Sequence, residues 1–252
     1  MIRRFDVLAG LASLGFALAS SGQLPAATFN LNPISDAFVS SANAANNYGG
    51  GGGLGVSAAG LPKGELQTLL QFDLAGAKTS FDTALGAGQW LVQSISLQLA
   101  ASNPGNPIFN ASAAGQFSIS WMQNDSWVEG TGTPMAPGGT GVTWNSLPTF
   151  LSGSDQALGT FSFSGATSGA FNYSLALGSG VVGDTTAGQL ASLRLLAADT
   201  TMSGVFNSRS FGTASARPIL AVTAVAVPEP ACWILAVMAV GGITVRRRSF
   251  FR

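Results

Sequence analysis

Short runs in which apolar and polar residues alternate dominate the centre of the chain. Phe117, Ile119 and Trp121 alternate with two serines, and the same period of two recurs in residues 95–99 and 70–74. Successive side chains of a strand point to opposite faces, so each run predicts a strand with one buried face. Further short apolar runs predict additional strands at residues 29–31, 37–40, 54–56, 142–144, 161–163, 171–177, 193–196, 205–206 and 219–225.

Turn-forming residues separate these runs and indicate an all-β fold. Clusters of Gly, Pro, Asn and Ser occupy residues 43–53, 102–107 and 130–141, and only residues 186–196 have a helix-like pattern. Many short strands divided by turn signals predict an antiparallel β-sandwich or barrel. No repeat of about 20–50 residues is evident, which disfavours a propeller or a solenoid. We therefore expect one all-β domain over residues 28–224.

The composition excludes several classes of enzyme. Only 9% of the residues are charged, the chain has 33 glycines, and it has no histidine and a single cysteine, Cys232. Without histidine there is neither an imidazole base for a hydrolase triad nor an HExxH zinc site. One cysteine forms no internal disulfide and no Cys-rich metal site. Residues 28–227 contain five cations and nine acids, and this negative balance disfavours a nucleic-acid partner.

The N-terminus predicts export. Arg3 and Arg4 precede an apolar stretch, residues 7–18, that is too short to span a bilayer. A basic start, a short apolar stretch and small residues after it are typical of a secretory signal peptide. We assign residues 1–27 to this signal, which we expect to form a helix, with small residues suited to cleavage near residues 17–19 and again near 25–27.

The C-terminus has a second targeting pattern, over residues 225–252. A Val-Pro-Glu-Pro sequence precedes fifteen uncharged residues, 231–245, and then an arginine cluster. An apolar helix with arginines at one end inserts into a membrane and keeps its positive end cytoplasmic. The residues that define the pattern are Val227, Pro228, Glu229, Pro230, Arg246, Arg247 and Arg248.

This C-terminal order resembles the PEP-CTERM sorting signal of exported proteins from biofilm-forming Gram-negative bacteria. The resemblance implies recognition by an exosortase, a membrane-embedded protease or transpeptidase, with processing near residues 228–230. It also implies export through the inner membrane, insertion of a C-terminal transmembrane sorting helix before processing, and delivery to the cell surface or extracellular matrix.

The body of the chain contains a second ordered set of short fragments, at residues 35–39, 46–49, 70–74, 127–130, 142–144, 206–209 and 217–220. In this order the fragments resemble the DNRLRE domain, which is related to the family 96 carbohydrate-binding modules. The resemblance implies a jelly-roll antiparallel β-sandwich on an extracellular protein that binds polysaccharide. The glycine run at residues 49–53 is longer than the usual Asn-Tyr-Gly turn of this family.

Three aromatic residues beside loop signals, Tyr48, Trp127 and Trp144, are candidates for glycan binding. Exposed indole and phenol rings offer a flat apolar face on which a sugar ring stacks. Burial under the end of the sandwich is the alternative for all three. Carboxylate oxygens at Asp36, Asp73 and Asp125 are weaker candidates for a Ca²⁺ site, because their spacing does not match a calcium-binding loop. No other cofactor is expected.

Two further patterns raise enzymatic alternatives. Glycine motifs that begin at Gly50 and Gly178 match a dinucleotide fingerprint, but the fingerprint requires a βαβ unit that this chain does not predict. Asp125 and Glu129 are the best carboxylate pair, yet on a strand they would lie about 13 Å apart, too far for a glycosidase.

We therefore expect a non-catalytic surface or matrix protein that associates with exopolysaccharide in a biofilm. Two alternatives remain open: a structural matrix protein without sugar affinity, and a histidine-free glycan hydrolase or lyase.

Overall fold

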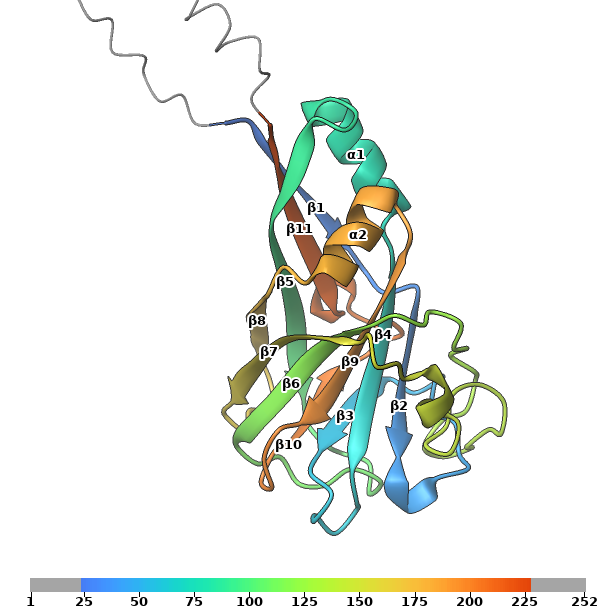
Figure 1. The fold of residues 1–252 in the computed structure, drawn as a ribbon. Helices are drawn as coiled ribbons and strands as arrows, with labels where there is room; N and C mark the ends of the chain where they lie inside the picture. The colour runs from blue at the N-terminus through green and yellow to red at the C-terminus, as the bar shows by residue number, and fades with distance from the viewer. Residues whose placement is uncertain (1–23, 228–252) are drawn as a thin grey trace, which may run out of the picture.

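Eleven antiparallel strands build the protein, whose computed structural model describes residues 24–227 (Figure 1). Every pairing between strands is antiparallel. The prediction of an all-β antiparallel fold is therefore confirmed, and the jelly-roll topology stays a prediction. The eleven strands form one continuous sheet that curls, and we describe this sheet as two parts, sheet A and sheet B.

Sheet A has four strands and sheet B has seven. Sheet A contains β1 (Ala26–Leu31), β11 (Ile219–Ala226), β5 (Trp90–Ser102) and β8 (Ala170–Leu175), in this order. The end of β5 also pairs with β10, at Ala101 and Ser102, and so joins the two parts. Sheet B contains β10 (Ser203–Asn207), β3 (Gly53–Ser57), β4 (Leu66–Asp73), β9 (Leu190–Ala197), β6 (Gly115–Met122) and β7 (Gln156–Phe163), with β2 (Ser35–Ser40) on β4.

The core lies between the two parts of the curled sheet. On β6, the predicted apolar face of Phe117, Ile119 and Trp121 is buried. Phe117 contacts Tyr173 of sheet A edge-on, with ring centroids 5.0 Å apart. A face of alternating residues therefore fills the interior, as the period of two predicts, and its polar alternates remain on the outer side.

Two helices lie together at the end of the molecule where both described termini emerge (Figure 1). They are α1 (Ala75–Leu85) and α2 (Ser179–Ala187). Three single turns of 3-10 helix are η1 (Ser41–Asn43), η2 (Leu147–Phe150) and η3 (Ala214–Ala216).

Two of the local predictions are wrong. The helix-like pattern of residues 186–196 does not give a helix beyond Ala187, because Gly188 adopts the left-handed conformation that stops α2 (φ 68°). The following residues form β9, which pairs with β4 on one side and β6 on the other; these two ladders override the local pattern. The strand predicted within this range, at residues 193–196, is confirmed as part of β9 (Leu190–Ala197). Residues 142–144 were expected to form a strand, but they belong to a long irregular segment.

Both chain ends leave the sandwich side by side. Ala26 lies opposite Val225, and the Ala226 N–H donates to the Pro25 carbonyl (2.9 Å). The connections around residues 58–65, 103–114 and 198–202 lie at the opposite end (Figure 1). The domain therefore starts at Ala26, inside the segment assigned to the signal peptide, and runs to Ala226, inside the assigned sorting segment.

Most of the two targeting segments lies outside the described residues, which begin at Leu24 and end at Val227. The signal peptide, the sorting motif and its arginine cluster therefore stay predictions. Within the described part of the chain, no helix is long and apolar enough to cross a membrane.

Candidate functional site

A long irregular segment, residues 123–155, lies over part of the outer face of sheet B, and we call it the cover loop. It contributes Trp127, Val142 and Leu147 to a small apolar cluster. The sheet side of the cluster consists of Ala37, Val39, Leu69 and Met122, on β2, β4 and β6.

Asn47 fastens the cover loop through its side chain. Its Nδ2 donates to the carbonyls of Glu129 (2.7 Å) and Val142 (2.8 Å), and its Oδ1 accepts the N–H groups of Gly49 (3.2 Å) and Gly132 (3.0 Å). All four hydrogen-bonding positions of the buried amide are thus filled. The Asn-Tyr-Gly segment, residues 47–49, therefore acts as a structural clamp that holds the cover loop in place.

A second fastening joins β2, the cover loop and the segment after β10. Arg209 donates from Nε to Glu129 Oε1 (2.7 Å), and its Nη2 pairs with Glu129 Oε2. The Arg209 backbone N–H donates to Asp36 Oδ2 (2.6 Å), and the Asp36 N–H donates to Glu129 Oε1 (2.9 Å). We call Asp36, Glu129 and Arg209 the carboxylate clamp.

Asp36 is a deeply buried acid of the clamp. It is 1% exposed, and its Oδ1 has no hydrogen-bond partner among the described residues. Burial raises the pKa of the Asp36 carboxyl to about 7; the Arg209 backbone N–H opposes this rise, and the negative charge of Glu129 adds to it. The raised pKa means that the folded state favours the protonated form of this carboxyl.

The sequence fragments that carry the family resemblance meet at this place. Residues 35–39, 46–49, 127–130, 142–144 and 206–209 supply the two clamps and the apolar cluster beneath the cover loop. A fourth contact comes from residues 70–74, where Gln71 Nε2 donates to the Asp125 carbonyl (2.7 Å). The fragments thus encode the attachment of the cover loop.

The structure corrects two of the three proposed glycan-binding aromatics. Tyr48 is 2% exposed and its ring stacks on Phe38, with centroids 4.6 Å apart. Trp127 is 3% exposed and donates from Nε1 to Ser192 Oγ (2.9 Å). Neither ring presents a face to solvent, because each fills space between a loop and sheet B. Trp144 is half-buried and packs against the cluster under the cover loop.

The three aspartates proposed for Ca²⁺ serve separate structural roles. Asp36 belongs to the carboxylate clamp, Asp73 accepts the Ala75 N–H at the start of α1 (2.9 Å), and Asp125 lies in the cover loop. Among residues 24–227, no group of three or more acidic, cysteine or histidine side chains is placed to hold a metal ion. In the carboxylate pair Asp125 and Glu129, the Glu129 carboxylate forms an ion pair with Arg209.

Beside the cover loop, sheet B exposes a row of polar side chains that we call the polar face. They point away from the core on alternate positions of β4, β6, β7 and β9. Ser118 on β6 and Thr160 on β7 are directly opposite, with their hydroxyl oxygens 3.0 Å apart. The polar face consists of Gln116, Ser118, Ser120, Thr160, Ser162 and Arg194, with the apolar Leu196 among them, and Gln67, which is 4% exposed, lies at its edge.

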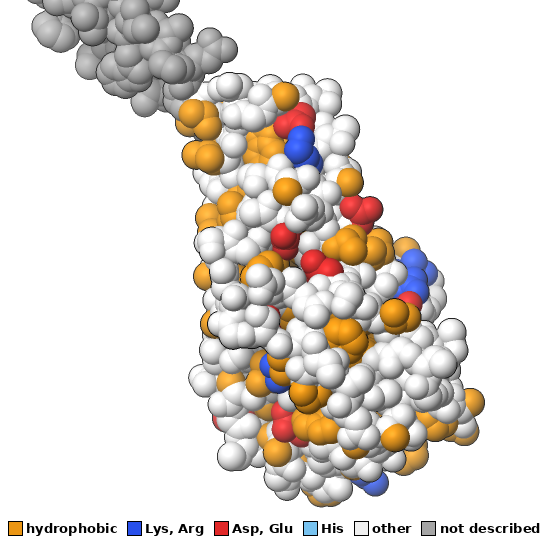
Figure 2. All heavy atoms as spheres, turned by 45° about the vertical axis from the view of Figure 1, so that its right-hand side comes forward, with side chains coloured by type: hydrophobic (Ala, Val, Ile, Leu, Met, Phe, Trp, Pro, Cys, Tyr) orange, Lys and Arg blue, Asp and Glu red, His pale blue; other side chains and the backbone are white. Residues whose placement is uncertain are grey.

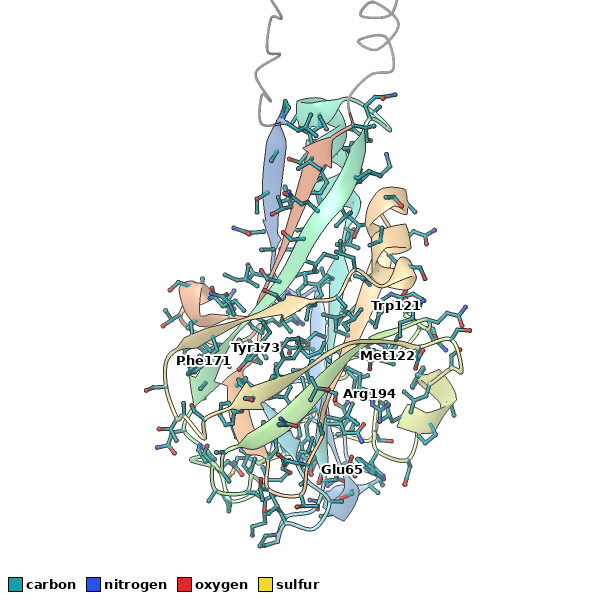
Figure 3. The ribbon with its side chains drawn as sticks, turned by 60° about the vertical axis from the view of Figure 1, so that its left-hand side comes forward. Glu65, Trp121, Met122, Phe171, Tyr173 and Arg194 are labelled. Carbon is teal, nitrogen blue, oxygen red and sulfur yellow. The ribbon has the colours of Figure 1, made fainter. Side chains whose placement is uncertain are left out.

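A hydrogen-bonded chain of three side chains borders this face. Arg194 Nε donates to Gln67 Oε1 (2.8 Å), and Gln67 Nε2 donates to Glu65 Oε1 (2.5 Å). Burial lowers the pKa of Arg194, although Glu65 and Asp155 act in the opposite direction. Figure 3 shows Met122, Arg194 and Glu65 following one another down the sheet. Within residues 24–227, the Nη1 and Nη2 atoms of Arg194 have no hydrogen-bond acceptor.

Two cavities flank the connection between β3 and β4, at the end of the molecule opposite the termini. The first, about 330 Å³, is lined by Glu65, Asp199 and Thr200 together with the small residues of segments 58–60 and 197–198, and Glu65 connects it to the edge of the polar face. The second, about 410 Å³, lies between residues 61–63 and 109–113. Figure 2 shows that charged side chains on this view are scattered, among white polar and orange apolar ones.

Comparison with known families decides the class of this domain. The family model described as carbohydrate-binding module family 96 matches residues 27–224. The chain belongs to this family. The match spans both sheets and the cover loop, and it confirms the family resemblance of the central fragments. A search of curated proteins found no match.

The sequence analysis did not single out Glu65, Gln67 and Arg194, which the structure brings together at the edge of the polar face. One signal for Arg194 was available: it is one of five cations between residues 28 and 227, and it interrupts an apolar run. A charged residue inside a strand that is otherwise buried lies on the outward position of that strand. The partnership with Gln67 depends on the pairing of β4 and β9.

Proposed function

We propose that this member of family 96 is a non-catalytic domain that binds polysaccharide along the polar face. The observation that carries the proposal is the Arg194–Gln67–Glu65 chain, which borders an open row of hydroxyls and ends at a cavity. A binding site of this kind needs a shallow surface with convergent donors and acceptors. Of the outer faces of sheets A and B, the face of sheet B carries charged side chains and ends at a cavity.

The chemistry of the polar face suits a sugar chain. Vicinal sugar hydroxyls both donate and accept hydrogen bonds. The Arg194 guanidinium offers a planar set of N–H donors, and Glu65 offers carboxylate acceptors. The serine and threonine hydroxyls of β6 and β7 do both. Because Tyr48 and Trp127 are buried, recognition depends on hydrogen bonds and not on stacking against these rings.

The outer face of sheet A is the competing surface. None of its four strands contains a charged residue, and its outward positions are small or uncharged, such as Thr28, Gln98 and Asn172. It has hydroxyls and amides but no ionic group and none of the cavity-lining residues. We therefore place the sugar on sheet B.

The first test measures binding of the full-length protein to a panel of neutral polysaccharides: glucan, mannan, galactan and xylan. Arg194→Ala should weaken binding by about tenfold or more, because hydrogen bonds to a charged group are among the strong ones. Arg194→Lys should recover only part of the affinity, since lysine lacks the planar fork.

Gln98→Ala, on the outer face of sheet A, is the matched control and should bind like the unmodified protein. Full affinity in Arg194→Ala, or loss of affinity in Gln98→Ala, would contradict the proposed site. Failure to bind any glycan would favour the structural matrix alternative, and release of reducing ends would favour a hydrolase or lyase.

We further propose that the domain is exported and sorted to the cell surface or matrix of a Gram-negative biofilm by an exosortase acting near residues 228–230. The arrangement of the ends supports this: both leave the sandwich at one end, and the two cavities lie at the other. A chain held by its C-terminal segment, in the membrane before processing, would present the polysaccharide-binding end outward.

Mass spectrometry of the protein recovered from the cell surface tests the sorting proposal. We expect a C-terminus before Ala231 and an N-terminus at or before Ala26, since cleavage after Ala27 would remove two residues of β1. A surface form that keeps residues 246–252 would contradict processing by an exosortase.

A further inference from the structure

The two segments that form the walls of the second cavity are hydrogen-bonded to each other. The cavity lies between the connection that contains residues 61–63 and the segment 109–113. Asn110 ties the two together: its Nδ2 donates to Ser57 Oγ (3.1 Å) and to the Gly64 carbonyl (3.3 Å), and its Oδ1 accepts the Lys63 N–H (2.9 Å). Asn110 itself is 6% exposed. The separation of the two walls is therefore set before any ligand arrives, which lowers the entropy lost on binding.

The lining of this cavity combines apolar and polar groups. Phe109 is half-buried and is held from behind by Phe38, with ring centroids 5.1 Å apart. Leu61 and Pro62 supply the facing apolar surface. The Ser112 hydroxyl oxygen is buried and has no hydrogen-bond partner among the described residues.

Lys63 lies on the rim. It is exposed, and its ammonium makes no ion pair within residues 24–227. The volume of about 410 Å³ falls within the range of about 300–1,000 Å³ that is typical of small-molecule sites.

We propose that this cavity is a second sugar subsite, which takes one pyranose unit of the same polymer that lies on the polar face. The apolar C–H face of the ring would lie on Phe109. Rotation of the Ser112 side chain, which lines the cavity, would bring its buried and unpartnered hydroxyl to a sugar hydroxyl, and a sugar oxygen would accept from Lys63 Nζ. The inference rests on the proposed function and adds a second point of contact to it.

The position of the cavity supports a shared ligand. Gly60 lines the first cavity and Leu61, its neighbour in sequence, lines the second. One short connection thus separates the end of the polar face from the second subsite. Two subsites joined by one chain act together, because binding at the first raises the effective concentration at the second. Affinity should therefore rise stepwise when an oligosaccharide becomes long enough to reach both.

The test measures affinity by calorimetry on the full-length protein, with the glucan, mannan, galactan or xylan that binds and with its oligosaccharides of increasing length. Ser112→Ala and Lys63→Ala should each weaken binding of the polymer by about three- to tenfold. Each substitution should also abolish the stepwise rise in affinity as the oligosaccharide becomes longer. Lys78→Ala is the matched control, because Lys78 is the other lysine of the chain and belongs to α1, at the opposite end.

Ser112→Ala also separates binding from folding. The variant removes a buried hydroxyl that has no partner, so it should leave the free energy of unfolding unchanged or raise it. Weaker binding by a protein of equal or greater stability then reports on the cavity itself.

The outcomes separate this inference from the proposed function. If Arg194→Ala weakens binding while Ser112→Ala and Lys63→Ala bind normally, the second subsite is wrong and the polar face stands. If the two cavity variants bind weakly and Arg194→Ala binds normally, the polar face is wrong and the cavity alone binds the sugar, so it is not a second subsite. If no polysaccharide binds, both are wrong.

Discussion

Asp36→Asn should stabilise the protein at pH 8 by about 4 kcal/mol and leave its stability near pH 4 almost unchanged. The pKa of Asp36 is about 7 in the folded protein against an ordinary value of 3.8. This difference in pKa between the folded and unfolded states corresponds to about 4 kcal/mol in the free energy of unfolding, since a tenfold change in proton affinity corresponds to about 1.4 kcal/mol. The folded state binds the extra proton between pH 4 and pH 7, so the contribution of Asp36 to stability is lost as the pH rises through this window.

Asparagine matches the shape of the protonated carboxyl and keeps an oxygen that accepts the Arg209 N–H, so it should retain the clamp without the pH dependence. The measurement is urea unfolding of both proteins from pH 4 to pH 8, taken as a difference curve, because other acids contribute their own slopes. The difference should grow with pH and level off above pH 8.

Asp199→Asn provides a control of opposite sign. The Asp199 carboxylate accepts N–H groups from Met202, Thr201 and Gln116, which lowers its pKa. Its stabilisation is present above the ordinary pKa and is lost on acidification, so Asp199→Asn should be less stable than the unmodified protein at neutral pH and should converge with it in acid. A flat difference curve for Asp36→Asn would show that Asp36 is ionised at neutral pH in the folded protein.

Trp127→Ala should lower the free energy of unfolding by about 3–5 kcal/mol, as expected when a buried aromatic side chain is deleted from a packed cluster. The indole fills the space between the cover loop and sheet B, and its Nε1–H satisfies Ser192 Oγ. In a domain of this size the midpoint of thermal unfolding should fall by about 10 °C. Trp127→Phe should have a smaller effect, since it keeps part of the apolar contact and loses the hydrogen bond.

Thermal unfolding of the three proteins provides the measurement, and Trp144→Ala is the control. Trp144 comes from the same loop but is half-buried, so its removal should have a smaller effect than that of Trp127. Equal stability of Trp127→Ala and the unmodified protein would mean that the cover loop opens freely and that the cluster contributes little.

The strands could be predicted from the sequence because apolar and polar residues alternate wherever one face of a strand is buried. Phe117, Ile119 and Trp121 on β6 are an example: they fill the core, and the intervening serines stay outside. The helix-like pattern of residues 186–196 was misleading beyond Ala187 for a tertiary reason, although the strand predicted at residues 193–196 is part of β9. Ala191, Leu193 and Leu195 are buried between two neighbouring strands, and local propensity does not report on neighbours that are distant in sequence.

The candidate site was harder to predict, because loop signals say which residues are near a loop but not what the loop covers. Tyr48 and Trp127 stand beside turn residues, yet the cover loop folds onto sheet B and buries both rings. The chain of Glu65, Gln67 and Arg194 arises from the register of β4 against β9, which places Arg194 opposite Leu69 and diagonal to Gln67. Register of this kind is set by the packed face and not by a local motif.

The family fragments illustrate the same difference. Their order was sufficient to identify the family, and the structure shows that they meet at the two clamps. The fragments that carry the family resemblance therefore hold the cover loop, and the residues that we propose for sugar binding lie next to them.

The most direct test of the central claim is amide hydrogen exchange of the full-length protein with and without the bound polysaccharide. We predict that the polysaccharide protects amides of β6, β7 and β9, and of residues 58–65 and 109–113, and leaves sheet A unchanged. Protection confined to β1, β11 and β8 would place the sugar on the other face and contradict the account.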